Sequence, residues 1–164
     1  MKKIILIGFA ACYKTSVGQL LADKLGCNVV DTDDEIERME NKSVQQIFET
    51  HGEAYFRERE SQLLATLQAD NVVVACGGGC VLSPVFAEFI RDSIVIRLTA
   101  SVETVHARLG TTSRPLFDGL TVEELSNYMQ TRAPLYERYC SITIATDNKT
   151  PEQVAEQILQ CLPQ

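Results

Sequence analysis

Directly after the apolar run from Ile4 to Ile7 comes GFAACYKT, residues 8 to 15, and a helical pattern follows from Ser16 to Leu25. The eight residues match the phosphate-loop pattern G-x-x-x-x-G-K-[ST] except at Tyr13, where the second glycine would stand. A strand, such a loop and a helix bring backbone N–H groups and a helix N-terminus together around a polyphosphate. The order therefore predicts a nucleotide site. The alternative is a strand–loop–helix corner with a surface lysine.

Within this loop, Lys14 is predicted to reach the β- and γ-phosphates, and the Thr15 hydroxyl to coordinate magnesium. Tyr13 raises a question, because a non-glycine residue forced into the left-handed region stores about 1–3 kcal/mol. We expect its side chain to turn outward while its N–H still faces the phosphates. The alternative is a differently bent loop that binds nucleotide weakly or only after another ligand. Cys12, near the helix N-terminus, is either a reactive thiol or a small loop filler.

The rest of the chain alternates short apolar runs with helical segments. Such runs, rich in β-branched residues and without polar alternation, are typical of parallel strands covered on both faces. They are Lys3–Ile7, Asn28–Val30, Val72–Ala75, Ile94–Leu98 and Ile142–Ile144. Helix starts are marked by capping boxes at residues 43–46 and 121–124 and by Thr150-Pro151. The 164 residues therefore predict one α/β domain of three layers, α/β/α, around a five-stranded parallel sheet.

Three segments between these elements carry polar or glycine-rich sequence. Asp31 and Asp33 follow the second predicted strand, where open α/β sheets collect ligands, although capping of a helix by Asp33 and Asp34 is an equal alternative. Residues 77–79 are three consecutive glycines. The loop at about residues 110–120 has a glycine near each end and no clear period, as lids often do.

Composition excludes several classes of partner. The formal net charge is −7, so a broad nucleic-acid-binding surface is not expected. No apolar run approaches the roughly 20 residues of a membrane span. The short apolar run at the N-terminus is needed as a strand and does not predict an export signal. The six cysteines are therefore expected to be reduced thiols in the cytoplasm, and nothing in the surface pattern demands more than a monomer.

Six motifs occur in an order and at a spacing that resemble the shikimate kinase family. They are Gly8-Phe9 with Lys14-Thr15-Ser16-Val17-Gly18, Asp31-Thr32-Asp33, Gly52-Glu53 with Phe56-Arg57 and Glu60, Gly77-Gly78-Gly79, Arg114-Pro115-Leu116, and Arg132-Ala133-Pro134-Leu135-Tyr136. The resemblance spans essentially the whole chain. It implies a phosphate-loop kinase fold similar to nucleoside monophosphate kinases. It also implies transfer of the γ-phosphoryl group of ATP to the 3-hydroxyl of shikimate, a step of aromatic amino-acid biosynthesis.

For the acceptor, the resemblance implies that Arg57 and Arg132 grip the shikimate carboxylate, a bidentate task that suits a guanidinium fork. Asp33 looks like the acceptor for the ring hydroxyls, including the attacking one. Gly78 would let a backbone N–H approach the ring, and Glu60 would orient Arg57. The helical segment at about residues 33–60 would therefore bind substrate. Taken singly, each arginine could equally be a surface residue.

For the donor, the resemblance implies a nucleotide site formed by the loop and two arginines. Its residues are Ala11, Cys12, Tyr13, Lys14, Thr15, Ser16, Arg108 and Arg114. Arg108 resembles the residue that lies against the adenine ring. Arg114 would close over the phosphates as charge develops in the transition state. Asp31 and Thr15 would hold Mg²⁺.

The loop departs from the family, which usually has glycine at the positions of Ala11 and Tyr13. We expect the Ala11 change to be mild if its φ is negative, whereas Tyr13 bears on ATP affinity. Two alternatives follow: a kinase of another small hydroxy acid or sugar, or a catalytically weakened shikimate-binding protein.

Overall fold

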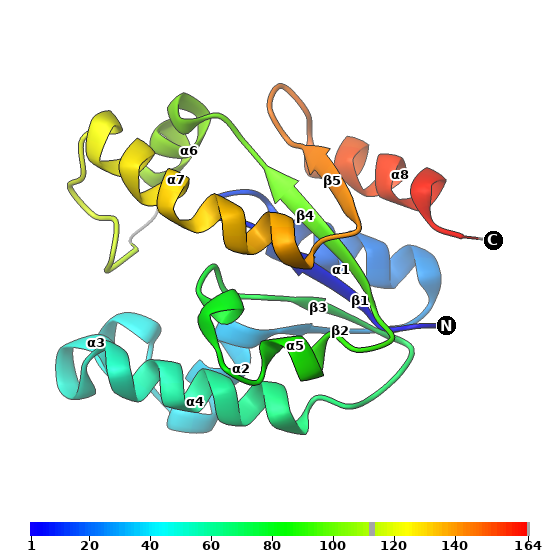
Figure 1. Cartoon of the computed structure of the whole chain (residues 1–164), viewed down its shortest axis with the longest axis horizontal. Helices are drawn as coiled ribbons and strands as arrows, with labels where there is room; N and C mark the ends of the chain where they lie inside the picture. The colour runs from blue at the N-terminus through cyan, green and yellow to red at the C-terminus, as the bar shows by residue number, and fades with distance from the viewer. Residues whose placement is uncertain (112–113, 164) are drawn as a thin grey trace.

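The computed structural model describes residues 1–111 and 114–163, and these form a layered α/β domain (Figure 1). The elements in chain order are β1 (Ile4–Ile7), α1 (Lys14–Leu25), β2 (Asn28–Asp31), α2 (Thr32–Glu40), α3 (Val44–His51), α4 (Glu53–Thr66), β3 (Val72–Ala75), the 3-10 turn η1 (Cys80–Leu82), α5 (Phe86–Phe89), β4 (Ile94–Thr99), α6 (Val102–Leu109), α7 (Val122–Tyr139), β5 (Ile142–Ala145) and α8 (Pro151–Cys161).

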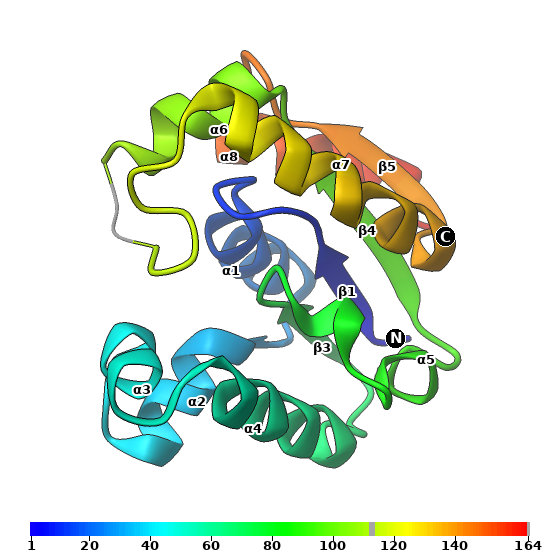
Figure 2. The same ribbon diagram turned by 60° about the vertical axis from the view of Figure 1, so that its left-hand side comes forward.

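The five strands form one parallel sheet in the order β2-β3-β1-β4-β5, which confirms the predicted fold class. Each strand ends within one residue of its predicted position. Central β1 is fully buried along its length, since helices cover the sheet on both sides. In Figures 1 and 2, α1 and α8 lie against one face, and α7 and α5 lie on the opposite side.

The predicted helix starts are also confirmed. Ser43 and Gln46 form a capping box at α3, and Thr121 and Glu124 form one at α7. Thr150 caps α8 ahead of a proline in its first turn. None of the helices in residues 1–111 and 114–163 is long and apolar enough to cross a membrane.

The helices α2, α3 and α4 form a separate group beside the β2 edge of the sheet (Figure 2). They share a small core of their own, made of Ile36, Ile47, Phe56 and Leu63. The predicted substrate-binding segment, about residues 33–60, covers α2, α3 and the first half of α4. Its role stays a prediction.

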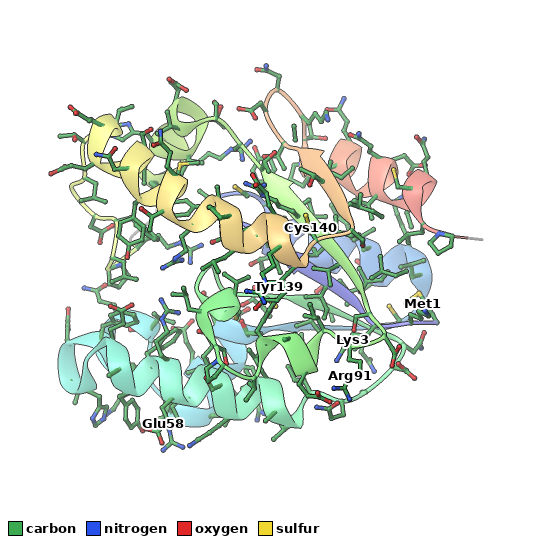
Figure 3. The ribbon with its side chains drawn as sticks, in the orientation of Figure 1. Met1, Lys3, Glu58, Arg91, Tyr139 and Cys140 are labelled. Atoms are coloured by element: carbon green, nitrogen blue, oxygen red, sulfur yellow. The ribbon has the colours of Figure 1, made fainter. Side chains whose placement is uncertain are left out.

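At the other end of the sheet, Lys3 and Arg91 lie near the N-terminus (Figure 3). Lys3 is buried, and its ammonium donates to the carbonyls of Leu67 and Phe89. These bonds satisfy the charge locally, so Lys3 holds the base of the sheet and takes no part in the cavity at the opposite end.

Candidate active site

A cavity of about 360 Å³ opens at the carboxyl ends of β1, β2 and β3. The strand order reverses around β1, because β3 lies on one side of it and β4 on the other, and ligands of open α/β sheets bind at such a point. The cavity brings together every residue that the sequence analysis assigned to a site. These are Ala11, Cys12, Tyr13, Lys14, Thr15, Ser16, Asp31, Asp33, Arg57, Gly78, Arg108, Arg114 and Arg132.

The loop between β1 and α1 presents unpaired backbone donors. The N–H groups of residues 10–16 donate to no acceptor in the described part of the chain. Lys14 Nζ meanwhile donates to the carbonyl oxygens of Gly8, at 2.8 Å, and Phe9, at 2.6 Å. Desolvation lowers the pKa of Lys14. A concave row of N–H groups beside a cation at a helix N-terminus is suited to binding a polyphosphate.

Asp31 connects this loop to α2. Its Oδ2 accepts a 2.5 Å hydrogen bond from the Thr15 hydroxyl, while its Oδ1 accepts from the N–H groups of Asp33 and Asp34. Asp31 is thus the N-cap of α2. The alternative that Asp33 and Asp34 cap this helix is wrong, because both lie inside its first turn.

The pair of a carboxylate and a hydroxyl fits Mg²⁺, which is usually bound by one or two protein oxygens, phosphates and water. Among residues 1–111 and 114–163, no three His, Cys, Asp or Glu side chains gather around a possible metal position. Thr15 and Asp31 would therefore share the ion with phosphate oxygens and water. That assignment stays a prediction.

Asp33 lines the cavity near Lys14 of the phosphate loop and Arg114. Burial, followed by the nearby charges of Asp31 and Glu60, raises its pKa to about 6. Arg114 Nη1 lies 3.9 Å from Asp33 Oδ2 and acts in the opposite direction. A β-carbon at Gly77 would lie 2.5 Å from Asp33 Oδ1, which explains why this position needs glycine. A carboxylate with a pKa near neutrality can exchange a proton with a substrate hydroxyl.

Arg57 reaches the cavity from α4 and is held by its own helix. Its Nη1 donates to Glu60 Oε1 at 2.9 Å, and its Nη2 lies 3.4 Å from Glu53 Oε1. Glu60 is buried, and it also accepts from the thiol of Cys80. The Arg57 Nε atom is buried with no hydrogen-bond partner in the described part of the chain. An oxygen of water or of a ligand would satisfy such a buried donor.

The charged residues around Arg57 lie on two different faces of α4. Glu58 points away from the body of the molecule on the outer side of α4 (Figure 3). Arg57, in contrast, lines the cavity, and the Glu60 side chain is only 1% exposed. The alternative that Arg57 belongs to a solvated helix face is wrong.

Arg132 enters from α7, on the opposite wall, and is only 5% exposed. Its Nη1 donates to the carbonyl oxygen of Gly78 at 3.0 Å, and the hydroxyl of Tyr136 donates to the same oxygen at 2.6 Å. Burial raises the pKa of Tyr136 to about 12, so it remains a donor. Tyr136 ends the motif that begins at Arg132, and the sequence predicts no role for it. Tyr136 lies one helical turn after Arg132 on α7, and both side chains hold the glycine loop through the Gly78 carbonyl.

Comparison with known proteins agrees with this geometry. The family model described as shikimate kinase matches residues 10–163. The chain belongs to the shikimate kinase family. Shikimate kinase of Dehalococcoides mccartyi is 39% identical over 158 residues, covering 94% of this chain and 90% of the relative. That of Thermodesulfovibrio yellowstonii is 39% identical over 164 residues, covering 98% and 94%.

Among solved structures, the shikimate kinase of Acinetobacter baumannii in complex with shikimate superposes with a TM-score of 0.92. It is 34% identical and covers 98% of this chain and 92% of that one. Full-length likeness to shikimate kinases therefore extends from the sequence to the arrangement of the elements around the cavity.

Two loop residues depart from the glycines usual in shikimate kinases, and both adopt left-handed backbone. Tyr13 has φ 68° and Ala11 has φ 58°. The expectation that Ala11 is mild rested on a negative φ and is wrong. Each such residue stores about 1–3 kcal/mol. The Tyr13 side chain does not turn outward as expected: its ring is half-buried against the Arg108 guanidinium and lines the cavity.

Cys12 is 1% exposed, and burial raises the pKa of its thiol. A buried thiol with a raised pKa is disfavoured as a thiolate, which supports the filler interpretation. The lid loop predicted at about residues 110–120 includes Thr112 and Ser113, which lie outside the described residues. After Arg114 the chain is anchored by Phe117, whose ring packs on Phe9 and Tyr128. No sequence signal distinguished Phe117 from other loop residues.

Proposed function

We propose that this chain transfers the γ-phosphoryl group of ATP to the 3-hydroxyl of shikimate, giving 3-phosphoshikimate, ADP and a proton. The observation that carries the proposal is one cavity lined by a phosphate loop and by two guanidinium groups, from α4 and α7. Arg57, with its unpaired Nε, and Arg132 suit a carboxylate between them.

Asp33 is proposed as the group that orients the attacking hydroxyl and accepts its proton. It lines the cavity, close enough to Lys14 and Arg114 for their charges to act on its pKa. Its raised pKa keeps it mostly ionised above pH 6 and basic enough to take a proton late in the transfer. The nearby Arg114 is proposed to contact the transferred phosphoryl group, where its charge would stabilise the transition state.

Lys14 is proposed to leave the carbonyls of Gly8 and Phe9 and to bind the β- and γ-phosphates, beside the N–H groups of the loop. Mg²⁺, held by Thr15 and Asp31, would neutralise phosphate charge when bound. The cytoplasmic location and the monomeric state expected from the sequence also stay predictions.

A coupled assay of ADP formation tests the proposal. Purified protein with ATP and Mg²⁺ is expected to release ADP only when shikimate is added, and folded protein without this dependence would overturn it. Other small hydroxy acids and sugars, offered at equal concentration, test the kinase alternative. A faster reaction with one of them would favour that alternative.

Two variants locate the carboxylate site. Arg57→Lys and Arg132→Lys keep the charge but lose the fork, and each is expected to raise the KM for shikimate about 10- to 100-fold. Matched controls are Arg59→Lys on α4 and Arg138→Lys on α7, since neither residue lines the cavity. An effect on the KM for ATP alone would contradict the assignment.

A further inference from the structure

Tyr13 makes a close contact that the loop pattern does not call for. Its ring centroid lies 3.7 Å from Cζ of Arg108. The other lysine–ring and arginine–ring approaches in the described part of the chain range from 4.2 to 5.8 Å. This short separation indicates face-to-face stacking of the ring and the guanidinium.

The Arg108 guanidinium is fixed independently of Tyr13. Its Nη1 donates to the Ala11 carbonyl at 2.9 Å and to the Thr146 hydroxyl at 3.0 Å, and its Nη2 donates to the Thr146 carbonyl at 3.2 Å. Thr146 is fully buried and is anchored to the Thr99 carbonyl. The guanidinium therefore has a set plane, and Tyr13 adds an aromatic surface to a cation that is already in place.

This surface lies at one end of the cavity. Figure 2 places the loop between β1 and α1 in the middle, with α6 on one side of it and the group α2–α4 on the other. The groups suited to a hydroxy acid, Arg57 and Asp33, come from the α2–α4 side. The reacting phosphate must face them, so the nucleoside end of the donor has to extend to the side that Ala11, Tyr13 and Arg108 line.

We infer that Tyr13 is a nucleobase-binding residue of this chain: the Arg108 guanidinium backs one face of its ring, and the purine of the phosphoryl donor stacks on the other face. The inference rests on the proposed kinase reaction for the identity of the donor. A purine offers a wide π face, which suits an aromatic ring whose other face is held by a guanidinium. A pyrimidine covers less of that surface, so Tyr13 is also a specificity residue for the base.

Two ligands separate contact with the base from contact with the phosphates. ADP carries the base, whereas inorganic tripolyphosphate carries phosphates alone. Their affinities are measured by calorimetry for the wild type, Tyr13→Phe and Tyr13→Ala. All three residues at position 13 carry a β-carbon, so the left-handed backbone has a similar strain in each protein.

Tyr13→Ala is expected to weaken ADP binding about 5- to 30-fold while tripolyphosphate binding stays within about twofold. Tyr13→Phe keeps the ring and is expected to bind ADP within about threefold of the wild type. The preference for ATP over CTP, taken as the ratio of their affinities, should fall in Tyr13→Ala and persist in Tyr13→Phe.

Three results would overturn the inference. Equal losses for ADP and tripolyphosphate would mean that position 13 acts through the shape of the loop. Tighter ADP binding by Tyr13→Ala would mean that the ring occupies the place of the base. Unchanged ADP binding would mean that the ring contacts nothing in the nucleotide. Thermal melts of each variant establish that the folded protein is being compared.

These binding measurements need no acceptor, so they are independent of the reaction. If the wild type fails to phosphorylate shikimate but shows the expected pattern with ADP, the proposed function fails and the inference stands. If shikimate is phosphorylated but the ADP pattern is absent, the inference alone fails.

Discussion

Glu60 Oε1 accepts a hydrogen bond of 2.9 Å from Arg57 Nη1, and the Glu60 side chain that does so is 1% exposed. The carboxylate is therefore a fixed support for a cation that lines the cavity. Desolvation raises the pKa of Glu60, while Arg57 and Cys80 act against that rise.

Removing this support should damage acceptor binding and stability together. Glu60→Ala leaves the Arg57 guanidinium largely buried without its carboxylate, so we expect the free energy of unfolding to fall by about 3 kcal/mol. The KM for shikimate should rise at least about tenfold, whereas the affinity for ADP should change little. Urea denaturation and steady-state kinetics measure these effects. Glu58→Ala, an exposed change on the same helix, is the control, and an unaltered KM in Glu60→Ala would contradict the supporting role.

Protonation of Asp33 should make the rate of the reaction fall at acidic pH. Its pKa is raised to about 6, and only the ionised carboxylate can accept a proton. The value of kcat/KM for shikimate is therefore expected to be constant above about pH 7 and to fall about tenfold per unit well below pH 6. A pH profile over the range in which the fold persists measures this. Asp33→Asn should lower kcat about 100-fold or more and lose this fall at acidic pH. A wild-type profile that is flat down to pH 5 would exclude Asp33 as the titrating group.

Asp31 has two separable tasks, one for each carboxylate oxygen. Asp31→Asn keeps an N-cap for α2 but removes charge from the position proposed for Mg²⁺, so we expect a higher Mg²⁺ requirement with a nearly unchanged Tm. Asp31→Ala should add a loss of about 1 kcal/mol in stability. Rates measured against Mg²⁺ concentration, with a thermal melt of each variant, separate the tasks. Identical Mg²⁺ curves for Asp31→Asn and the wild type would place the ion elsewhere.

Gly79 is expected to be intolerant of any side chain. A β-carbon there would overlap the Arg57 guanidinium, although the φ of −95° suits any residue. Gly79→Ala should therefore displace Arg57 and raise the KM for shikimate about tenfold or more. Gly110→Ala is the matched control, since its added β-carbon meets only ordinary contacts at a helical φ of −62°. Equal kinetics for the two variants would show that Arg57 can relocate without loss.

The parts that the sequence predicted well depend on local pattern. Four apolar residues in a row at Ile4–Ile7 indicate a buried central strand, and the Ser43–Gln46 capping box marks a helix start within four residues. The phosphate loop is equally local. Residues 8 to 15 follow a strand and precede a helix, so the place of Lys14 and Thr15 follows from chain order alone.

The parts that it missed depend on contacts between distant segments. The stacking of Tyr13 on Arg108 joins residues 95 positions apart, and the bond from Tyr136 to Gly78 joins residues 58 positions apart. No periodicity reports such pairs. The capping of α2 by Asp31 was missed for a different reason: three nearby aspartates can all cap, and only the first helical residue decides between them.

The separate core of α2, α3 and α4 has a consequence for the order in which parts of the protein unfold. Four side chains, Ile36, Ile47, Phe56 and Leu63, bury far less apolar surface than the main core, so this group is expected to loosen first under mild denaturant. Since Arg57 lies on α4, the protein would then lose its affinity for the organic acid, while the phosphate loop at the end of β1 would still bind nucleotide. Inactivation would precede global melting, and a bound acid, by joining α4 to α7, would delay it.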